Sequence, residues 1–192
     1  MKQVIDDYFR IYKMMVESKI FRNVFKEGDA WLNTGDLMRD QGCSHMAFVD
    51  RVGDTFRWKG HNMSTTEVEN IFGSFEQVLL VTVYGVQVPG NDGRAGMAAF
   101  LANVDAEKID FKALAEHLIN NLPPYGVPVF LRLKTKLATT STHKLQKAPL
   151  KKEGFDLKLI EDALYVKVPR DANYVPLTKE IYDEIMSGKY IL

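Results

Sequence analysis

Several residue types are scarce in this 192-residue sequence, and each scarcity excludes a class of protein. Cys43 is the only cysteine, so the chain has no internal disulfide framework and no cysteine pair for a structural zinc site. We therefore expect a reducing compartment. The four histidines stand far apart in the sequence, without the spacing of paired metal ligands, and we expect no metal site.

The sequence also lacks an excess of charge and a long apolar segment. Lys and Arg together number 25, as do Asp and Glu, so no net charge attracts nucleic acid or an anionic membrane. The longest nearly apolar run, 78–86, has the length of a strand and falls far short of the ~18 residues of a spanning helix. Acidic residues near the start occupy the place of a signal peptide's apolar core. We expect the chain itself to be soluble and to face the cytosol.

The first fifty residues predict one helix and a few short strands. Apolar side chains recur at helical spacing over 3–20, which predicts an amphipathic helix whose partner surface need not lie within this chain. Residues 30–33 and 46–49 are typical of short strands, and a polar loop is expected at 39–45. We expect these strands to belong to a sheet whose other strands are not recognisable in the sequence.

From residue 51 the pattern predicts a small α+β domain. A strand is expected at 55–59, and Ser64 with Glu67 forms a capping box that opens a helix up to Phe75. Apolar strands at 78–88 and 95–102 are joined by a turn-rich segment, as in a hairpin. A helix at 110–122 and a strand at 129–133 follow. This order over about 80 residues favours a small sheet with two helices.

Four segments, taken in order, carry a resemblance to a known family. They are the Thr-Gly-Asp turn at 34–36, the stretch 50–60, the capping-box region 64–69 and Thr-Ser-Thr-His-Lys-Leu-Gln-Lys at 140–147. The set resembles the C-terminal part of adenylate-forming enzymes. Segments 54–69 and 83–100 resemble the fatty acid transport protein / very-long-chain acyl-CoA synthetase family within that group. The resemblance extends over nearly the whole chain.

This resemblance implies a fold and a division into domains. Residues 1–50 would be the end of the large AMP-binding domain. Residues 51–192 would be the C-terminal lid domain of the acyl-CoA synthetase fold, an α+β domain of small antiparallel sheets with packed helices. The polar link 51–54 contains a glycine and suits a hinge, where Gly53 or Asp54 would absorb the rotation of the lid.

The resemblance further implies a long- or very-long-chain fatty acid–CoA ligase. In the full-length enzyme, ATP with Mg²⁺ and coenzyme A would be substrates together with the fatty acid, and the product would be acyl-CoA. The phosphate loop and the acyl tunnel belong to the N-terminal domain and do not occur in these 192 residues. We therefore expect this chain to be inactive alone and to bind none of these molecules tightly. Full-length relatives are expected at a membrane of the endoplasmic reticulum, the peroxisome or the cell surface.

Nucleotide-binding residues also follow from the resemblance. Asp36, with Thr34, belongs to the Thr-Gly-Asp turn, and its acceptor-only carboxylate suits the two hydroxyls of a ribose. The same turn taken alone indicates only local stabilisation. Arg51 matches an arginine that contacts the nucleotide, and its guanidinium suits ribose or phosphate oxygens. The alternative for Arg51 is a surface ion pair with a neighbouring aspartate.

Lysines are assigned to the remaining steps. Lys59 and Gly60 match the strand end that lines the pantetheine tunnel for coenzyme A, with a plain turn as the alternative. His61 departs from the usual family pattern and is interpreted as a tolerated loop residue. Lys144 matches the adenylation lysine, whose ammonium would bridge the fatty carboxylate and the α-phosphate. Lys147, one helical turn later, is the alternative assignment.

Other interpretations of the basic stretch 131–152 stay open. Lys144 could be one solvated lysine among several, and the stretch could attract coenzyme A phosphates by charge alone. A nucleic-acid role is disfavoured because stacking aromatic residues are absent there. Ser141 and His143 replace a glycine and an aromatic residue of the family pattern, which would stiffen this loop and remove an anchor.

A second hypothesis treats the chain as a stand-alone, non-catalytic module that binds coenzyme A or a protein partner. The helix expected at 3–20 distinguishes the two hypotheses. In a fragment of a ligase its apolar face would be uncovered and could mediate a homodimer, whereas in a module this face would be packed.

Overall fold

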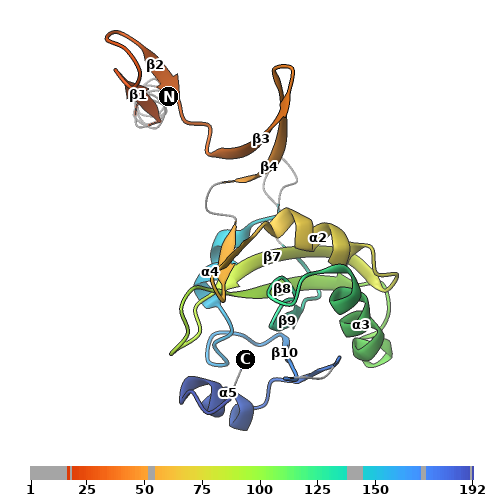
Figure 1. Cartoon of the computed structure of the whole chain (residues 1–192). Helices are drawn as coiled ribbons and strands as arrows, with labels where there is room; N and C mark the ends of the chain where they lie inside the picture. Colours follow the sequence, from red (N-terminus) through yellow and green to blue (C-terminus); the bar gives the residue numbers. More distant parts are fainter. Residues whose placement is uncertain (1–16, 18, 52–54, 138–144, 170–171, 191) are drawn as a thin grey trace, which may run out of the picture. The chain divides into compact units, whose positions relative to one another are not determined.

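The computed structural model (Figure 1) describes residues 17, 19–51, 55–137, 145–169, 172–190 and 192. They fall into two compact units, one up to Val52 and one from Gly53. In the part of the chain that is described, no helix has the length and apolar character needed to cross a bilayer. The helix expected at 3–20 lies almost entirely outside the described residues.

The described residues of the first unit form two β-hairpins. β1 (Ile20–Arg22) pairs with β2 (Ala30–Leu32), and β3 (Asp36–Gly42) pairs with β4 (His45–Arg51), both antiparallel. The prediction of a loop at 39–45 is wrong, because residues 39–42 belong to β3 and only two residues form the turn between β3 and β4. From Leu37 onward every side chain of β3 is exposed. The strand therefore lacks the apolar alternation by which a strand is recognised in a sequence.

No side chain among residues 17 and 19–48 is buried. The β1–β2 loop is held instead by Asp29, whose carboxylate accepts hydrogen bonds from the backbone N–H groups of residues 24–26 and from the indole N–H of Trp31. Two-stranded hairpins without an apolar partner are marginally stable in water. The apolar side chains most exposed on this unit are Phe21, Val24, Phe25, Trp31, Leu32, Leu37, Met38, Met46 and Phe48.

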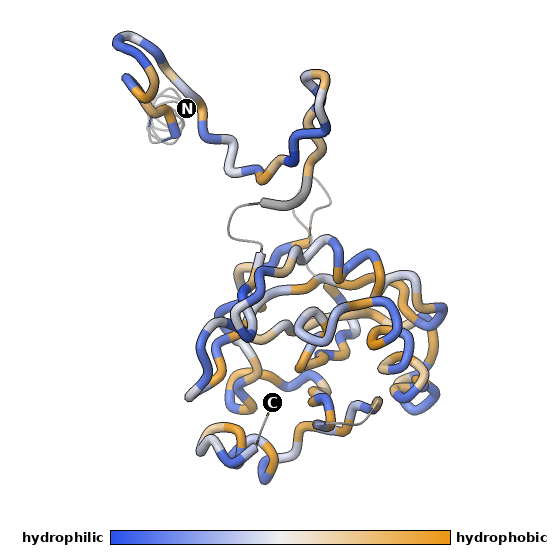
Figure 2. Tube along the Cα trace, in the orientation of Figure 1, coloured by the Kyte–Doolittle hydropathy of each residue, from blue (hydrophilic) through white to orange (hydrophobic). Residues whose placement is uncertain are grey.

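The second unit is built on a five-stranded sheet with the strand order β11–β10–β9–β8–β7. Neighbouring strands are antiparallel except β8 and β9, which are parallel. β7 and β8 are rich in apolar residues, coloured orange in Figure 2, and most of their length is buried. The strands are β7 (Val78–Val86), β8 (Ala95–Ala102), β9 (Phe130–Leu133), β10 (Ala163–Lys167) and β11 (Tyr174–Pro176).

Helices cover the sheet on both faces. α2 (Thr65–Gly73) and α3 (Phe111–Asn121) are capped by the side chains of Ser64 and Asp110, each of which accepts a backbone N–H three residues later. The ring of Phe72 in α2 lies against Phe100 in β8, and Phe111 in α3 lies against Tyr165 in β10. The ladder places Phe100 and Tyr165 on the same face of the sheet. α2 and α3 therefore share that face.

The opposite face is covered by the C-terminal part of the chain. α4 (Lys147–Glu153) and α5 (Lys179–Met186) flank Phe155, whose ring stacks on Phe130 of β9 with centroids 4.3 Å apart. Tyr182 of α5 meets the edge of the Phe155 ring. Because Phe130 and Phe100 point to opposite faces, the sheet is a layer between two sets of helices.

A third hairpin, β5 (Phe56–Trp58) with β6 (His61–Met63), packs over two glycines of the sheet. Gly85 and Gly96 are directly opposite each other in the β7–β8 ladder. A Cβ on Gly85 would lie 2.7 Å from the Cβ of Phe56, and one on Gly96 would lie 2.9 Å from its Cζ. The two missing side chains make the space in which Phe56 is buried.

The α+β class is confirmed, and the predicted elements from 55 to 133 are present as β5, α2, β7, β8, α3 and β9. The sequence reasoning missed β1, most of β3, β6, α4, β10, β11 and α5.

The glycine pair generates a prediction about stability. Gly85→Ala and Gly96→Ala should each lower the free energy of unfolding by about 1–3 kcal/mol, because the new methyl group displaces Phe56. Gly73→Ala is the control, since its Cβ would meet only Val81 Cγ1 at 3.6 Å and alanine favours a helix. Urea unfolding of the chain measures all three. Equal effects of Gly96→Ala and Gly73→Ala would contradict this packing of Phe56.

Candidate functional site

The Thr-Gly-Asp turn is held by two side-chain hydrogen bonds from residues within the same segment. The Gly35 N–H donates to Asn33 Oδ1 at 2.9 Å, and the Asp36 N–H donates to Thr34 Oγ1 at 3.2 Å. Gly35 has a φ of 77°, which suits a residue without a Cβ. Thr34 therefore supports the turn itself, and Asp36 is held at the first position of β3.

Asp36 and Arg51 are directly opposite each other in the β3–β4 ladder. The hairpin thus brings together the backbones of two residues that the sequence assigned to the nucleotide, although they are far apart in the chain. Three other candidates, Gly53, Asp54 and Lys144, lie outside the described residues, as do Ser141 and His143.

Lys59 and Gly60 form the two-residue turn between β5 and β6. Their φ angles are 49° and 84°, and a type I′ turn requires positive φ at both positions. The turn alone accounts for the glycine. A Cβ on Gly60 would meet no atom within 4 Å, so its backbone also borders open space. The Lys59 ammonium lies 5.9 Å from the centre of the Trp58 ring.

A small cavity of about 70 Å³ lies beside this turn. Its lining includes Trp58, Lys59, Pro124, Val127 and Lys167. The cavity therefore combines apolar side chains with two lysines beside the turn where the sequence expects the thin pantetheine arm of coenzyme A.

Lys147 is held within the second unit. Its Nζ lies 2.9 Å from Glu69 Oε1 and donates to Thr65 Oγ1 at 2.8 Å. The same Glu69 oxygen accepts the backbone N–H of Val83 at 2.7 Å. Because β7 is the edge strand of the sheet, this cluster satisfies an N–H at the edge and joins α4 to α2. The ammonium of Lys147 is therefore engaged in the interior contacts of the unit.

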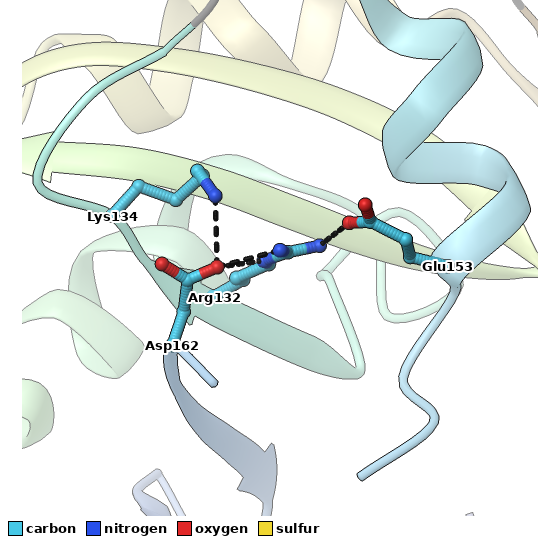
Figure 3. A network of polar contacts seen from close by, with 4 residues as sticks. All are labelled: Arg132, Lys134, Glu153 and Asp162. Carbon is cyan, nitrogen blue, oxygen red and sulfur yellow. Dashed lines mark hydrogen bonds and ion pairs between the residues drawn. The ribbon is translucent and has the colours of Figure 1, made fainter. Parts of the chain in front are cut away.

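A second cluster surrounds Arg132 and was missed by the sequence reasoning (Figure 3). The Arg132 side chain is only 4% exposed, and its guanidinium donates to Asp162 Oδ2 at 2.7 Å and to Glu153 Oε2 at 2.6 Å. Lys134 Nζ donates to the same Asp162 oxygen at 2.8 Å. Two cations of the basic stretch, Arg132 and Lys134, are thus paired with acids. The only signal in the sequence was a charged residue between apolar neighbours in β9.

The described residues contain no group of three or more His, Cys, Asp or Glu side chains arranged to hold a metal ion.

Comparison with known proteins identifies the family. No family model matches the chain. The chain is 47% identical over 173 residues to the medium/long-chain-fatty-acid–CoA ligase FadD6 of Mycobacterium tuberculosis. It is 44% identical over 174 residues to the long-chain fatty acid transport protein 3 of Homo sapiens. The matches cover 90% and 91% of this chain.

The chain is a C-terminal part of a member of the acyl-CoA synthetase / fatty acid transport protein family. It spans 29% of the length of FadD6 and 25% of the transport protein. The family resemblance seen in the sequence is confirmed, whereas the roles of individual site residues stay predictions.

Solved structures confirm the fold. A fatty acyl CoA synthetase of Mycobacterium tuberculosis aligns with a TM-score of 0.54 and 22% identity, over 65% of this chain and 24% of its own. ATP-bound MatB of Rhodopseudomonas palustris aligns with a TM-score of 0.59 and 20% identity, over 71% and 25%. The part of the chain that aligns, about two thirds of it, therefore shares its fold with these two proteins.

The Glu69–Lys147 pair should contribute to the stability of this family domain. Glu69→Ala is expected to lower the free energy of unfolding by about 2 kcal/mol, because it removes the acceptor of the Val83 N–H and the anion that pairs with the Lys147 ammonium. Glu69→Gln should cost less, since the amide oxygen still accepts from Val83. Lys108→Met is the control, because Lys108 and its partner Asp105 are 72% and 69% exposed and such pairs contribute at most about 1 kcal/mol. A loss in Glu69→Ala no larger than in this control would contradict the role of the pair.

The Arg132 cluster predicts a dependence of stability on pH. Burial opposes ionisation of Asp162, but hydrogen bonds from Lys134 and Arg132 outweigh it and lower the pKa of this carboxyl. A carboxyl with a lower pKa in the folded state adds stability above its unfolded pKa of about 4, and this stability is lost as pH falls through the folded pKa.

We therefore expect Asp162→Asn to destabilise the chain at pH 7 and to flatten the decline of stability below about pH 4. The exposed Asp105→Asn variant is the matched control. Urea unfolding across pH 2–7 measures both variants. A decline for Asp162→Asn as steep as that of the parent would show that the pairing of Asp162 is not a source of this dependence.

Proposed function

We propose that this chain is the C-terminal portion of a long- or very-long-chain fatty acid–CoA ligase. The observation that carries the proposal is the similarity of about 90% of the chain, at 44–47% identity, to the ligase FadD6 and the long-chain fatty acid transport proteins. The family of transport proteins suggests association with a membrane, and we propose that this portion faces the cytosol.

The complete enzyme would form acyl-CoA in two steps. A carboxylate oxygen of the fatty acid attacks the α-phosphorus of ATP, bound with Mg²⁺, and the bond to pyrophosphate breaks as the new P–O bond forms. The sulfur of coenzyme A then attacks the acyl carbon. A C–S bond forms, AMP leaves, and the proton of the thiol passes to solvent.

The first unit would contribute to nucleotide binding. Asp36 is the first residue of β3 and follows a turn that is held by hydrogen bonds within residues 33–36. In this fixed position its carboxylate is suited to accept hydrogen bonds from both ribose hydroxyls. Each such charge-assisted bond contributes about 1.5–3 kcal/mol. The position of Arg51 opposite Asp36 in the ladder supports a shared ligand, and Thr34 supports the backbone of Asp36.

Lys144 is the residue we assign to adenylation. Of the two lysines that the motif offers, Lys147 is already engaged with Glu69 and Thr65. A positioned ammonium beside the α-phosphate stabilises the charge of the transition state by roughly 3 or 4 kcal/mol. Rotation about Gly53 and Asp54 would bring the lid to the nucleotide, and the turn at Lys59 and Gly60 would receive coenzyme A in the second step.

The part of the enzyme that precedes this chain would supply the phosphate loop and the acyl tunnel. It would also cover the exposed apolar side chains of the two hairpins and their loops, among them Phe25 at 77% and Leu32 at 60% exposure. We therefore propose that the chain is inactive alone, binds ATP and coenzyme A weakly, and self-associates through its uncovered apolar faces.

The test joins this chain to the FadD6 sequence that precedes its matching part. The fusion should release pyrophosphate with ATP and a long-chain fatty acid, and it should form acyl-CoA, whereas the chain alone should do neither. Lys144→Ala should slow adenylate formation by about 10²-fold and spare thioester formation from supplied acyl-adenylate.

Lys147→Ala is the matched comparison. It should lower the stability of the chain, but it should change the ratio of adenylate formation to thioester formation less than Lys144→Ala does. Equal loss of both steps in Lys144→Ala would show that Lys144 is not the adenylation lysine. Pyrophosphate release by the chain alone would contradict the proposal that the chain is inactive without the preceding part of the enzyme. A fusion that folds but is inactive would favour the hypothesis of a non-catalytic module.

A further inference from the structure

Four side chains share one face of the β5–β6 hairpin. Phe56 is opposite Met63, and Trp58 is opposite His61, and residues directly opposite in an antiparallel ladder share a face. Phe56, Trp58 and Met63 are only 3–4% exposed. His61 is the fourth member of this face and the one next to the turn.

His61 has a specific partner at that position. Its ring stacks on the ring of Tyr125, with centroids 4.0 Å apart and planes at 9°. Tyr125 lies in a turn closed by the Gly126 N–H, which donates to the Pro123 carbonyl at 2.8 Å. The placement of His61 in a loop is therefore wrong, because His61 belongs to β6, where its exposed ring stacks on Tyr125.

The rest of the hairpin is held at further points. A Cβ on Gly126 would lie 2.6 Å from Met63 Cε, so the segment that carries Tyr125 also accommodates Met63. On the other strand, the Arg94 N–H donates to the Arg57 carbonyl at 2.6 Å, and Trp58 forms a bridge with Gly93. The His61–Tyr125 contact is thus the support adjacent to Gly60 on the β6 side.

We propose that His61 and Tyr125 form a positioning pair that holds the Lys59–Gly60 turn in place for the pantetheine arm of coenzyme A. This inference rests on the proposed function, which gives the turn that ligand. His61 acts through the backbone of Gly60, which it follows directly in the chain, and not through contact with the reacting atoms. Without the stacked ring, the end of the turn is free to move, and the open backbone surface at Gly60 loses its fixed position.

The main experiment measures each half-reaction in the fusion with the FadD6 segment. His61→Ala should raise the KM for coenzyme A by about 10-fold, because a shift of a positioning group by 1 Å has effects of this size or larger. Pyrophosphate release from ATP and fatty acid should stay within about 2-fold of the parent. His61→Phe keeps a flat ring on Tyr125 and should restore the KM to within about 3-fold.

Two further variants test the pair. Tyr125→Ala should reproduce the effect of His61→Ala, and the double variant should be no worse than either, since the two residues act as one unit. His117→Ala is the matched control. That histidine has a ring contact with Phe75 and lies 2.9 Å from the Ile71 carbonyl, and its loss should leave the KM for coenzyme A unchanged.

Amide hydrogen exchange in the 192-residue chain tests the pair without an enzymatic assay. The Gly60 and His61 amides should exchange about 10-fold faster in His61→Ala than in the parent, but not in His61→Phe. An unchanged KM for coenzyme A in His61→Ala, or a parallel loss of pyrophosphate release, would overturn the inference. If the parent fusion forms no acyl-CoA, the proposed function fails, and exchange at Gly60 still decides whether the pair holds the turn.

Discussion

The burial of β7 and β8 on both faces is the constraint on which the second unit depends. A strand pair without a polar face needs cover on both sides, which α2 and α3 provide on one face and the segment around Phe155 provides on the other. The glycine pair beneath Phe56 then fixes where the β5–β6 hairpin packs. Both the Lys59–Gly60 turn and the Lys147 cluster take their positions from this sheet.

The sequence was sufficient for elements whose apolar pattern is strong. β7, β8, α2 and α3 were predicted because their buried residues recur at strand or helix spacing. α4 and β11 were missed because they are short and bury few side chains, of which Leu150 and Tyr174 are the examples. β3 was missed in part because both of its faces are exposed, so its residues follow no alternation.

Some side chains of the candidate site were likewise predicted from the sequence, and others were missed. Asp36, Lys59 and Gly60 were predicted because their motifs, taken in order, resemble those of a known family. The pairs Arg132–Asp162 and Glu69–Lys147 join residues 30 and 78 positions apart (162 − 132 and 147 − 69), and no local pattern announces such contacts. These pairs also change the meaning of the charge count, because a chain with balanced charge can still hold its cations at specific internal acids.

The absence of buried side chains in residues 17 and 19–48 has a consequence for biosynthesis. In a longer family member whose C-terminal part matches this chain, the two hairpins would leave the ribosome after most of the protein has been synthesised. The hairpins could then settle on a surface that is already folded, and they would not need to be stable by themselves. Made separately, the same segment would present chaperones and proteases with uncovered aromatic side chains, so the order of translation would influence how this region acquires its structure.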